Sequence, residues 1–169
     1  MRPLVLFLSV PCLLTNMANA QALWKEARAG MSTKELLKTI KGLVPNPEDS
    51  PLSDGSTSPY ILKDVMLDGE SFTAMFYIKN DKLKQVHLSA PSEIGRASAV
   101  NTYSNLFKSL SDKYGMPKRT DVASFTRKEM IWILGKIDIT LLLISSEDGK
   151  LNFLKIIYGT RLTKERENL

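Results

Sequence analysis

The chain has few of the residues on which most enzymes and metalloproteins depend. Its 169 residues include one cysteine, Cys12, and one histidine, His87. Cys12 lies in an N-terminal segment that we predict to be removed, so the rest of the chain has no thiol for catalysis, metal binding or a disulfide. His87 lies in a predicted strand without a paired nucleophile, which favours a core or surface residue over a general base.

Sequence motifs of common catalytic sites are missing too. The chain has no G-x-S-x-G, no H-E-x-x-H and no glycine-rich phosphate loop. Glu26, Glu35, Glu70 and Glu129 offer carboxylates for glycosidase-type chemistry, but nothing in their spacing pairs them. We therefore expect no catalytic residues, no metal site and no cofactor, and we predict that the protein is not an enzyme.

The N-terminus has the three parts of a secretory signal peptide. Arg2 is followed by an apolar run from Leu4 to Leu14 and by the small residues of the A-N-A sequence at 18–20. An uncut membrane anchor is the alternative, but the run is short for a membrane span and contains Pro11. We predict cleavage after Ala20 and a periplasmic location, with no integral membrane segment in the mature chain.

The charge of the remaining chain is moderately positive. Removing residues 1–20 leaves 149 of the 169 residues and removes one charge, Arg2, so the net charge of +5 becomes +4. A small excess of this kind favours acidic lipid or protein surfaces. The lysines are scattered without a dense basic block, so we do not expect nucleic acid as a partner.

An internal repeat is predicted from two segments about 70 residues apart. "ELLKTIKGLVPNP" (35–47) aligns with "NLFKSLSDKYGMP" (105–117), and "DKLKQVHL" (81–88) aligns with "GKLNFLKI" (149–156). We expect an α+β fold of two related repeats, 21–90 and 91–169, each with helix packed on one face of an antiparallel sheet. They form two small subdomains or one continuous domain.

In the first repeat, Leu23, Trp24 and Ala27 predict a short helix over residues 21–29, which Gly30 would end. A second helix begins at Ser32, where Ser32 and Glu35 match a capping box, and it stops before Pro45. The polar segment 45–59 is predicted to be a mobile connector, with a binding loop as the alternative. Strands are predicted at 60–67, 70–78 and 82–90.

In the second repeat, apolar spacing predicts an amphipathic helix from Val100 to Tyr114, ended by Gly115. Strands are predicted at 119–126, 128–134, 136–145 and 150–159. A two-residue turn at Gly135-Lys136 sets the register of the hairpin around it. It predicts these pairs, all on the helix side: Leu134 with Ile137, Trp132 with Ile139, and Met130 with Leu141.

The opposite face of this hairpin is more apolar than a solvated face should be. Four of its six residues are strongly apolar. The face consists of Ile131, Ile133, Asp138, Thr140, Leu142 and Ile144. Contact between the two halves or a slip of the register by one residue would explain it. The alternative is a binding surface. For it we predict the partner-binding residues Met75, Tyr77, Ile131, Ile133, Thr140 and Leu142.

The segment around the second helix resembles a known bacterial module. Its pattern is G-M-S-x-x-x-L-x-x-x-I-x-G-x-x-P, carried by Gly30, Met31, Ser32, Leu36, Ile40, Gly42 and Pro45. It is similar to the BamE/SmpA-type module of envelope proteins and to the beta-lactamase inhibitory protein-like repeat. It departs from them by the extra residue Lys41, by further residues before the proline and by the lack of a lipobox.

The resemblance implies two short helices on an antiparallel sheet and a role in protein binding or outer-membrane assembly. We therefore expect a periplasmic, non-catalytic protein-binding module of inhibitor, immunity or envelope-assembly accessory type. Its partner would be another envelope or secreted protein. A small envelope hydrolase that uses carboxylates and a carrier of an apolar ligand remain alternatives.

Overall fold

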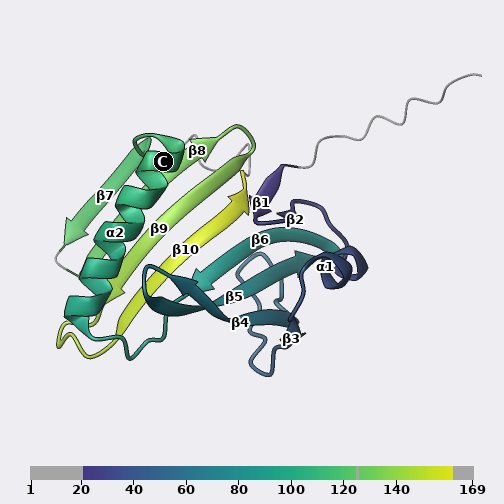
Figure 1. Cartoon of the computed structure of the whole chain (residues 1–169), viewed down its shortest axis with the longest axis horizontal. Helices are drawn as coiled ribbons and strands as arrows, with labels where there is room; N and C mark the ends of the chain where they lie inside the picture. Colours follow the sequence, from purple (N-terminus) through teal and green to yellow (C-terminus); the bar gives the residue numbers. More distant parts are fainter. Residues whose placement is uncertain (1–20, 125, 162–169) are drawn as a thin grey trace, which may run out of the picture.

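The computed structural model describes residues 21–124 and 126–161 (Figure 1). The predicted signal peptide and the C-terminal tail from 162 onward lie outside these residues. In the described part, two helices combine with an eight-stranded antiparallel sheet, which confirms the α+β class. The elements are β1 (Ala22–Trp24), β2 (Ala27–Arg28), α1 (Thr33–Thr39), β3 (Val44–Pro45), β4 (Tyr60–Leu67), β5 (Glu70–Lys79), β6 (Lys82–Ser89), α2 (Arg96–Tyr114), β7 (Arg119–Ser124), β8 (Arg127–Leu134), β9 (Ile137–Ser145) and β10 (Asn152–Thr160).

The large sheet has the strand order β3-β4-β5-β6-β10-β9-β8-β7. Strands from the first half of the chain therefore lie on one side and strands from the second half on the other. The last strand of each half, β6 and β10, meet at the centre as an antiparallel pair. One continuous sheet results, so the two halves share a single apolar core.

One face of this sheet is covered. Helix α2 packs across β8, β9 and β10 and buries Ala99, Tyr103 and Leu106. The indole of Trp132 in β8 lies beneath α2, where its Nε1 donates to the carbonyl of Gly115 at 2.8 Å. Gly115 has a φ of 79°, the left-handed conformation expected where glycine ends a helix. The predicted helix and its stop are both confirmed.

Helix α1 begins where the capping pattern predicts. The amide of Glu35 donates to the Ser32 hydroxyl at 3.3 Å, and the amide of Ser32 donates to the Glu35 carboxylate at 2.8 Å. Leu36 and Ile40 enter the shared core. The helix ends at Thr39, several residues before Pro45.

The helix predicted over residues 21–29 is wrong. This segment forms the small β1–β2 hairpin, which turns at Lys25 with a φ of 49°. Leu23, Trp24 and Ala27 are buried in the core, and the Trp24 ring lies 6.2 Å from that of Phe76. A helix this short is marginal by itself, whereas the hairpin buries the same side chains against the sheet.

The hairpin of β8 and β9 confirms the predicted register. Leu134 pairs with Ile137, Trp132 with Ile139 and Met130 with Leu141. The other predicted strands match the observed bounds to within a few residues, whereas the short strand β3 was not predicted. Register is thus fixed by the turn at Gly135, whose φ of 60° suits glycine.

Candidate functional site

The face of the sheet opposite α2 carries a continuous row of side chains that crosses seven strands. Residues that pair directly between neighbouring strands point to the same face. Pair by pair, the row runs through Ile61, Met75, His87, Ile157, Thr140, Ile131 and Arg119. We call this the central row, and we call the surface around it the helix-free face.

Two shorter rows flank the central row. One consists of Thr73, Ser89, Lys155, Leu142 and Glu129. The other consists of Tyr77, Gln85, Gly159, Asp138 and Ile133. The register therefore brings all six predicted partner-binding residues onto one face, three of them in the central row. Their part in binding stays a prediction.

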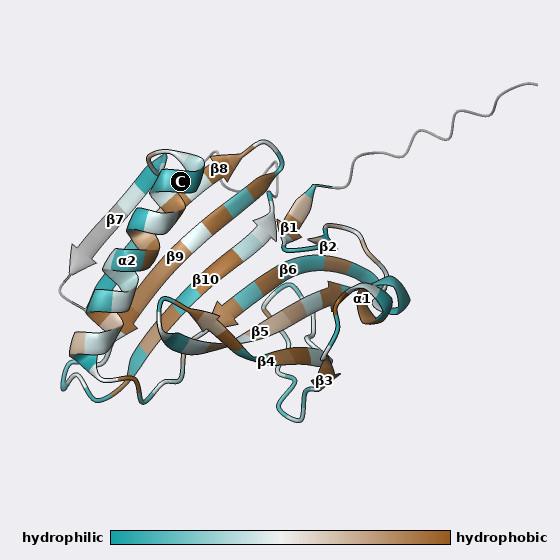
Figure 2. Ribbon diagram, in the orientation of Figure 1, coloured by the Kyte–Doolittle hydropathy of each residue, from teal (hydrophilic) through white to brown (hydrophobic). Residues whose placement is uncertain are grey.

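The half of this face built from β8, β9 and β10 carries large apolar residues as well as Glu129, Asp138 and Lys155, and no described helix covers it. Ile131, Ile133, Leu142 and Ile144 are half-buried. Phe153, which pairs with Ile144, is 43% exposed. Figure 2 shows the result as hydrophobic colour on successive residues toward the arrowhead of β9, in place of a strict alternation.

The half built from β5 and β6 is more deeply buried. The exposed fraction is 7% for Tyr77 and 6% for His87, and their ring centroids lie 4.4 Å apart. Gln85 Oε1 lies 2.9 Å from His87 Nε2. Burial, and next the positive charge of Lys155, lower the pKa of His87 to about 4. The imidazole is thus neutral near pH 7, as expected of a core residue.

The segment 45–59 contributes to this burial. Thr57 exchanges two backbone hydrogen bonds with Ile78, of 3.0 and 2.7 Å, and so extends the sheet beside β5. Asp49 accepts the amide of Ser58 at 2.6 Å. Burial, and next the charge of Asp49, raise the pKa of Tyr77. The segment is a hydrogen-bonded loop that flanks the face; the mobile connector and the binding loop both stay predictions.

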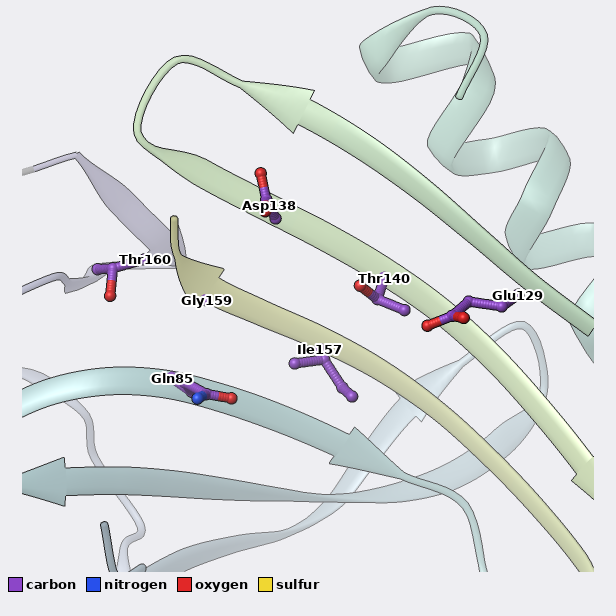
Figure 3. Close-up of a pocket in the computed structure, with 7 residues that line it drawn as sticks. All are labelled: Gln85, Glu129, Asp138, Thr140, Ile157, Gly159 and Thr160. Carbon is purple, nitrogen blue, oxygen red and sulfur yellow. The ribbon is translucent and has the colours of Figure 1, made fainter. Parts of the chain in front are cut away.

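A depression of about 160 Å³ lies where the rows cross the centre of the sheet (Figure 3). Figure 3 shows side chains from β6, β8, β9 and β10 around it. Its lining consists of Gln85, Glu129, Asp138, Thr140, Ile157, Gly159 and Thr160. Gly159 brings no side chain to the row between Gln85 and Asp138, which leaves the surface hollow there.

The glutamates considered for catalysis do not converge. Glu35 caps α1, Glu70 accepts the hydroxyl of Ser98, and Glu26 is exposed between β1 and β2. Glu129 alone of the four lines the depression, where it forms an ion pair of 3.1 Å with Arg127. Among the described residues, no group of three or more histidine, cysteine, aspartate or glutamate side chains is placed to hold a metal ion.

Sequence reasoning missed several residues of this face. Phe153, Ile157 and Gly159 belong to β10, which was predicted as a strand without an assignment of its faces. Alternation along β10 carried a usable signal, since Leu154 and Ile156 enter the core and their neighbours must point the other way. No sequence signal could have predicted the depression at Gly159, because it forms where β6, β9 and β10 lie side by side.

Comparisons with known proteins identified no protein similar to this chain. No family model matches the chain, and neither a curated protein nor a solved structure matches it. Neither helix within 21–124 and 126–161 has both the length and the hydrophobicity to cross a membrane.

Proposed function

We propose that the protein is a non-catalytic protein-binding module and that it binds its partner through the helix-free face. One observation carries the proposal: Ile131, Ile133, Leu142, Ile144 and Phe153 lie on the same face of three strands, among Glu129, Asp138 and Lys155, and no described helix covers them. A solvated face of an antiparallel sheet normally alternates with polar residues. Apolar patches of this kind typically mark interaction sites.

The proposed partner is another envelope or secreted protein, met in the periplasm. The N-terminal leader supports this location, and the pattern from Gly30 to Pro45 supports a module of the BamE/SmpA or beta-lactamase inhibitory protein type. An inhibitor, an immunity protein or an accessory of envelope assembly would use the face in the same way. Each would need an ordered, pre-formed surface, and a sheet supplies one.

We also propose that the two halves are related repeats. The sequence alignment places Leu88 over Ile156, and these two residues pair directly in the sheet. A two-fold axis between β6 and β10 would make such equivalent residues face each other. The strand order around that pair supports the axis, since three strands of each half follow on either side. The main departure from this two-fold symmetry is helix length, since α1 has 7 residues and α2 has 19.

The alternatives have less support. The depression, at about 160 Å³, is smaller than the roughly 300–1,000 Å³ of small-molecule sites. Its lining includes the side chains of Gln85, Glu129, Asp138 and Thr140, which suit an apolar ligand poorly. A hydrolase would rest on Glu129 and Asp138, and Glu129 is already engaged by Arg127.

The test is capture of partners from periplasmic extract with a double variant, Ile133→Lys with Leu142→Lys. A matched control carries two lysines off the face, at Met116→Lys and Ser109→Lys, both exposed positions in or just beyond α2. We expect the wild type and the control to enrich the same protein, and the face variant to lose it at least about tenfold.

Equal capture by the face variant would overturn the proposal. Loss of folding, followed by circular dichroism, would instead indicate that the face is an internal contact surface. A milder variant, Ile133→Thr with Leu142→Thr, keeps strand propensity and separates the two outcomes. It should fold and still lose the partner.

A further inference from the structure

The end of the molecule formed by α1 and the β5–β6 turn carries the whole positive excess of the described chain. We call it the basic end. It has six lysines and two carboxylates, while the other described residues contain 14 basic and 14 acidic side chains. Its lysines are Lys34, Lys38, Lys41, Lys79, Lys82 and Lys84. The amide of Thr33 donates to the Asp81 carboxylate at 2.9 Å, which joins the two elements (Figure 1).

Charge at this end is poorly neutralised within the protein. The two carboxylates, Glu35 and Asp81, are used as hydrogen-bond acceptors for backbone amides around the start of α1. Within the described residues, none of the six lysines forms a close ion pair. Lys79 Nζ donates to the carbonyl of Asp54, and the charge of Lys82 acts on Glu35 and Asp81 from a longer distance. Lys79 and Lys82 even pair directly across the β5–β6 hairpin, an arrangement of like charges that disfavours folding. Such an arrangement is relieved when an anionic surface binds.

Exposed apolar side chains lie among these lysines. Leu37 is 41% exposed on α1, three residues after Lys34 and four before Lys41. Val44, just beyond the helix, is 39% exposed. A helix with lysines around an exposed leucine suits the headgroup region of a membrane, where the cations meet phosphates and the apolar chain enters the acyl boundary.

We propose that the basic end docks on the surface of an anionic phospholipid bilayer. The pattern fits lipid better than nucleic acid, because the six cations are flexible lysines and α1 has no aromatic residue to stack on bases. The lysines of α1 lie on the core side of the sheet, where Leu36 and Ile40 are buried, and they are remote in the strand order from β8 and β9. The protein would therefore bind a membrane while the β8–β9 part of the helix-free face stays available to a partner.

Vesicle co-sedimentation tests the docking. The probe is phosphatidylcholine vesicles with or without about 30 mol % phosphatidylserine, at low and high salt. The N-terminus of the purified protein is first checked by mass spectrometry, because an uncleaved apolar leader would itself bind vesicles. We expect binding to the anionic vesicles that salt reverses, and little binding to the neutral ones.

The basic-end variant Lys34→Glu, Lys38→Glu, Lys41→Glu should lower the partition coefficient on the order of 100-fold. The control Lys108→Glu, Lys113→Glu, Lys118→Glu makes the same change of net charge on exposed residues elsewhere, and should bind nearly as the wild type does. Leu37→Ser should weaken binding roughly three- to tenfold without altering charge.

Three results would overturn the docking: equal loss in both triple variants, equal binding to neutral vesicles, or no binding at all. Retention on poly-glutamate without binding to vesicles would indicate an acidic protein as the partner in place of lipid. The glutamine version of the basic-end variant removes charge without reversing it, so it shows whether a loss comes from misfolding. Capture of a partner by the helix-free face is measured separately and does not depend on this result.

Discussion

The two faces of the large sheet are built from the same strands but differ in what packs against them. On the covered face, Trp132, Ile139, Leu141 and Ile156 are at most 2% exposed and pack under α2. On the helix-free face, most of the neighbouring chain positions are half-buried, Thr140 is buried, and Phe153 is 43% exposed. Both faces carry large apolar residues on β8 and β9, but the helix-free face also carries Glu129, Asp138, Thr140 and Lys155.

For the large apolar residues that both faces carry, the helix that packs against them decides which residues belong to the core. The strand β9 contains the run Leu141, Leu142, Leu143 and Ile144, in which alternate residues belong to opposite faces. In a sheet with helices on both faces such a run is ordinary. Here the described helices cover one face only, so half of the run has no helix packed against it.

The largest expected effect comes from placing a charge on the covered face at Leu141. Its exposed fraction is 0%, so Leu141→Lys buries an ammonium group without a partner. We expect a cost of at least about 5 kcal/mol, comparable with the stability of many domains. Circular dichroism and urea titration should find the variant unfolded, and a folded variant of near wild-type stability would contradict the assignment of this face.

Trp132→Ala should have the next largest effect. The indole is 1% exposed, lies 6.2 Å from the Phe107 ring and donates to the Gly115 carbonyl. Its removal leaves a cavity under α2 and should lower the free energy of unfolding by about 3–5 kcal/mol, as measured by urea titration. A matched Ile133→Ala variant on the other face should cost far less, and equal costs would mean that both faces are packed alike.

His87 tests the part of the helix-free face that resembles a core. Its pKa of about 4 lies below the ordinary value of 6.5, so the unfolded chain binds more protons between these pH values. The free energy of unfolding should therefore fall as pH drops through this window, by about 2 kcal/mol from pH 7 to pH 5. Urea titrations at both pH values should show that His87→Gln removes this part of the slope.

The other ionisable groups contribute equally to the pH dependence of unfolding in the wild type and in His87→Gln. Lys155 disfavours the charged imidazole, while Gln85 and Tyr77 contact the ring. The lowered pKa values of Glu35, Asp54 and Asp81 come mainly from hydrogen bonds outside this cluster. Identical pH slopes for the wild type and His87→Gln would indicate that water reaches the imidazole and that this half of the face is open.

The fold was largely predictable because its signals are local. The capping box at Ser32, the helix stop at Gly115 and the turn at Gly135 each act within a few residues, and each is confirmed. Residues 21–29 were assigned wrongly because their apolar spacing suits both a helix and a hairpin. Whether this segment forms a helix or a hairpin depends on packing against Phe76, which is distant in sequence and so absent from the local pattern.

The candidate site was predictable only in part, for the same reason. The hairpin of β8 and β9 is local, so Ile131, Ile133, Thr140 and Leu142 could be placed together on one face. Joining them to Met75 and Tyr77 needs the central pairing of β6 with β10, whose paired residues are about 70 positions apart. The hollow at Gly159 follows from that pairing as well.

The smallest expected effect on stability is also the most informative about function. Leu142 follows Leu141 in the chain but points to the helix-free face, beside Glu129 and Lys155. A lysine there can extend its ammonium group into water while its stem covers neighbouring strands. We expect Leu142→Lys to change the free energy of unfolding by no more than about 1 kcal/mol, measured by urea titration.

The same variant should nevertheless lose the captured partner, because a charge in a desolvated interface is costly. A cost near that of Leu141→Lys would mean that something in the chain covers Leu142, and the helix-free face would then be a second core. A small cost with unchanged capture would leave the face exposed but place the partner elsewhere. Only a small cost combined with lost capture fits a sheet that uses one face to fold and the other to bind.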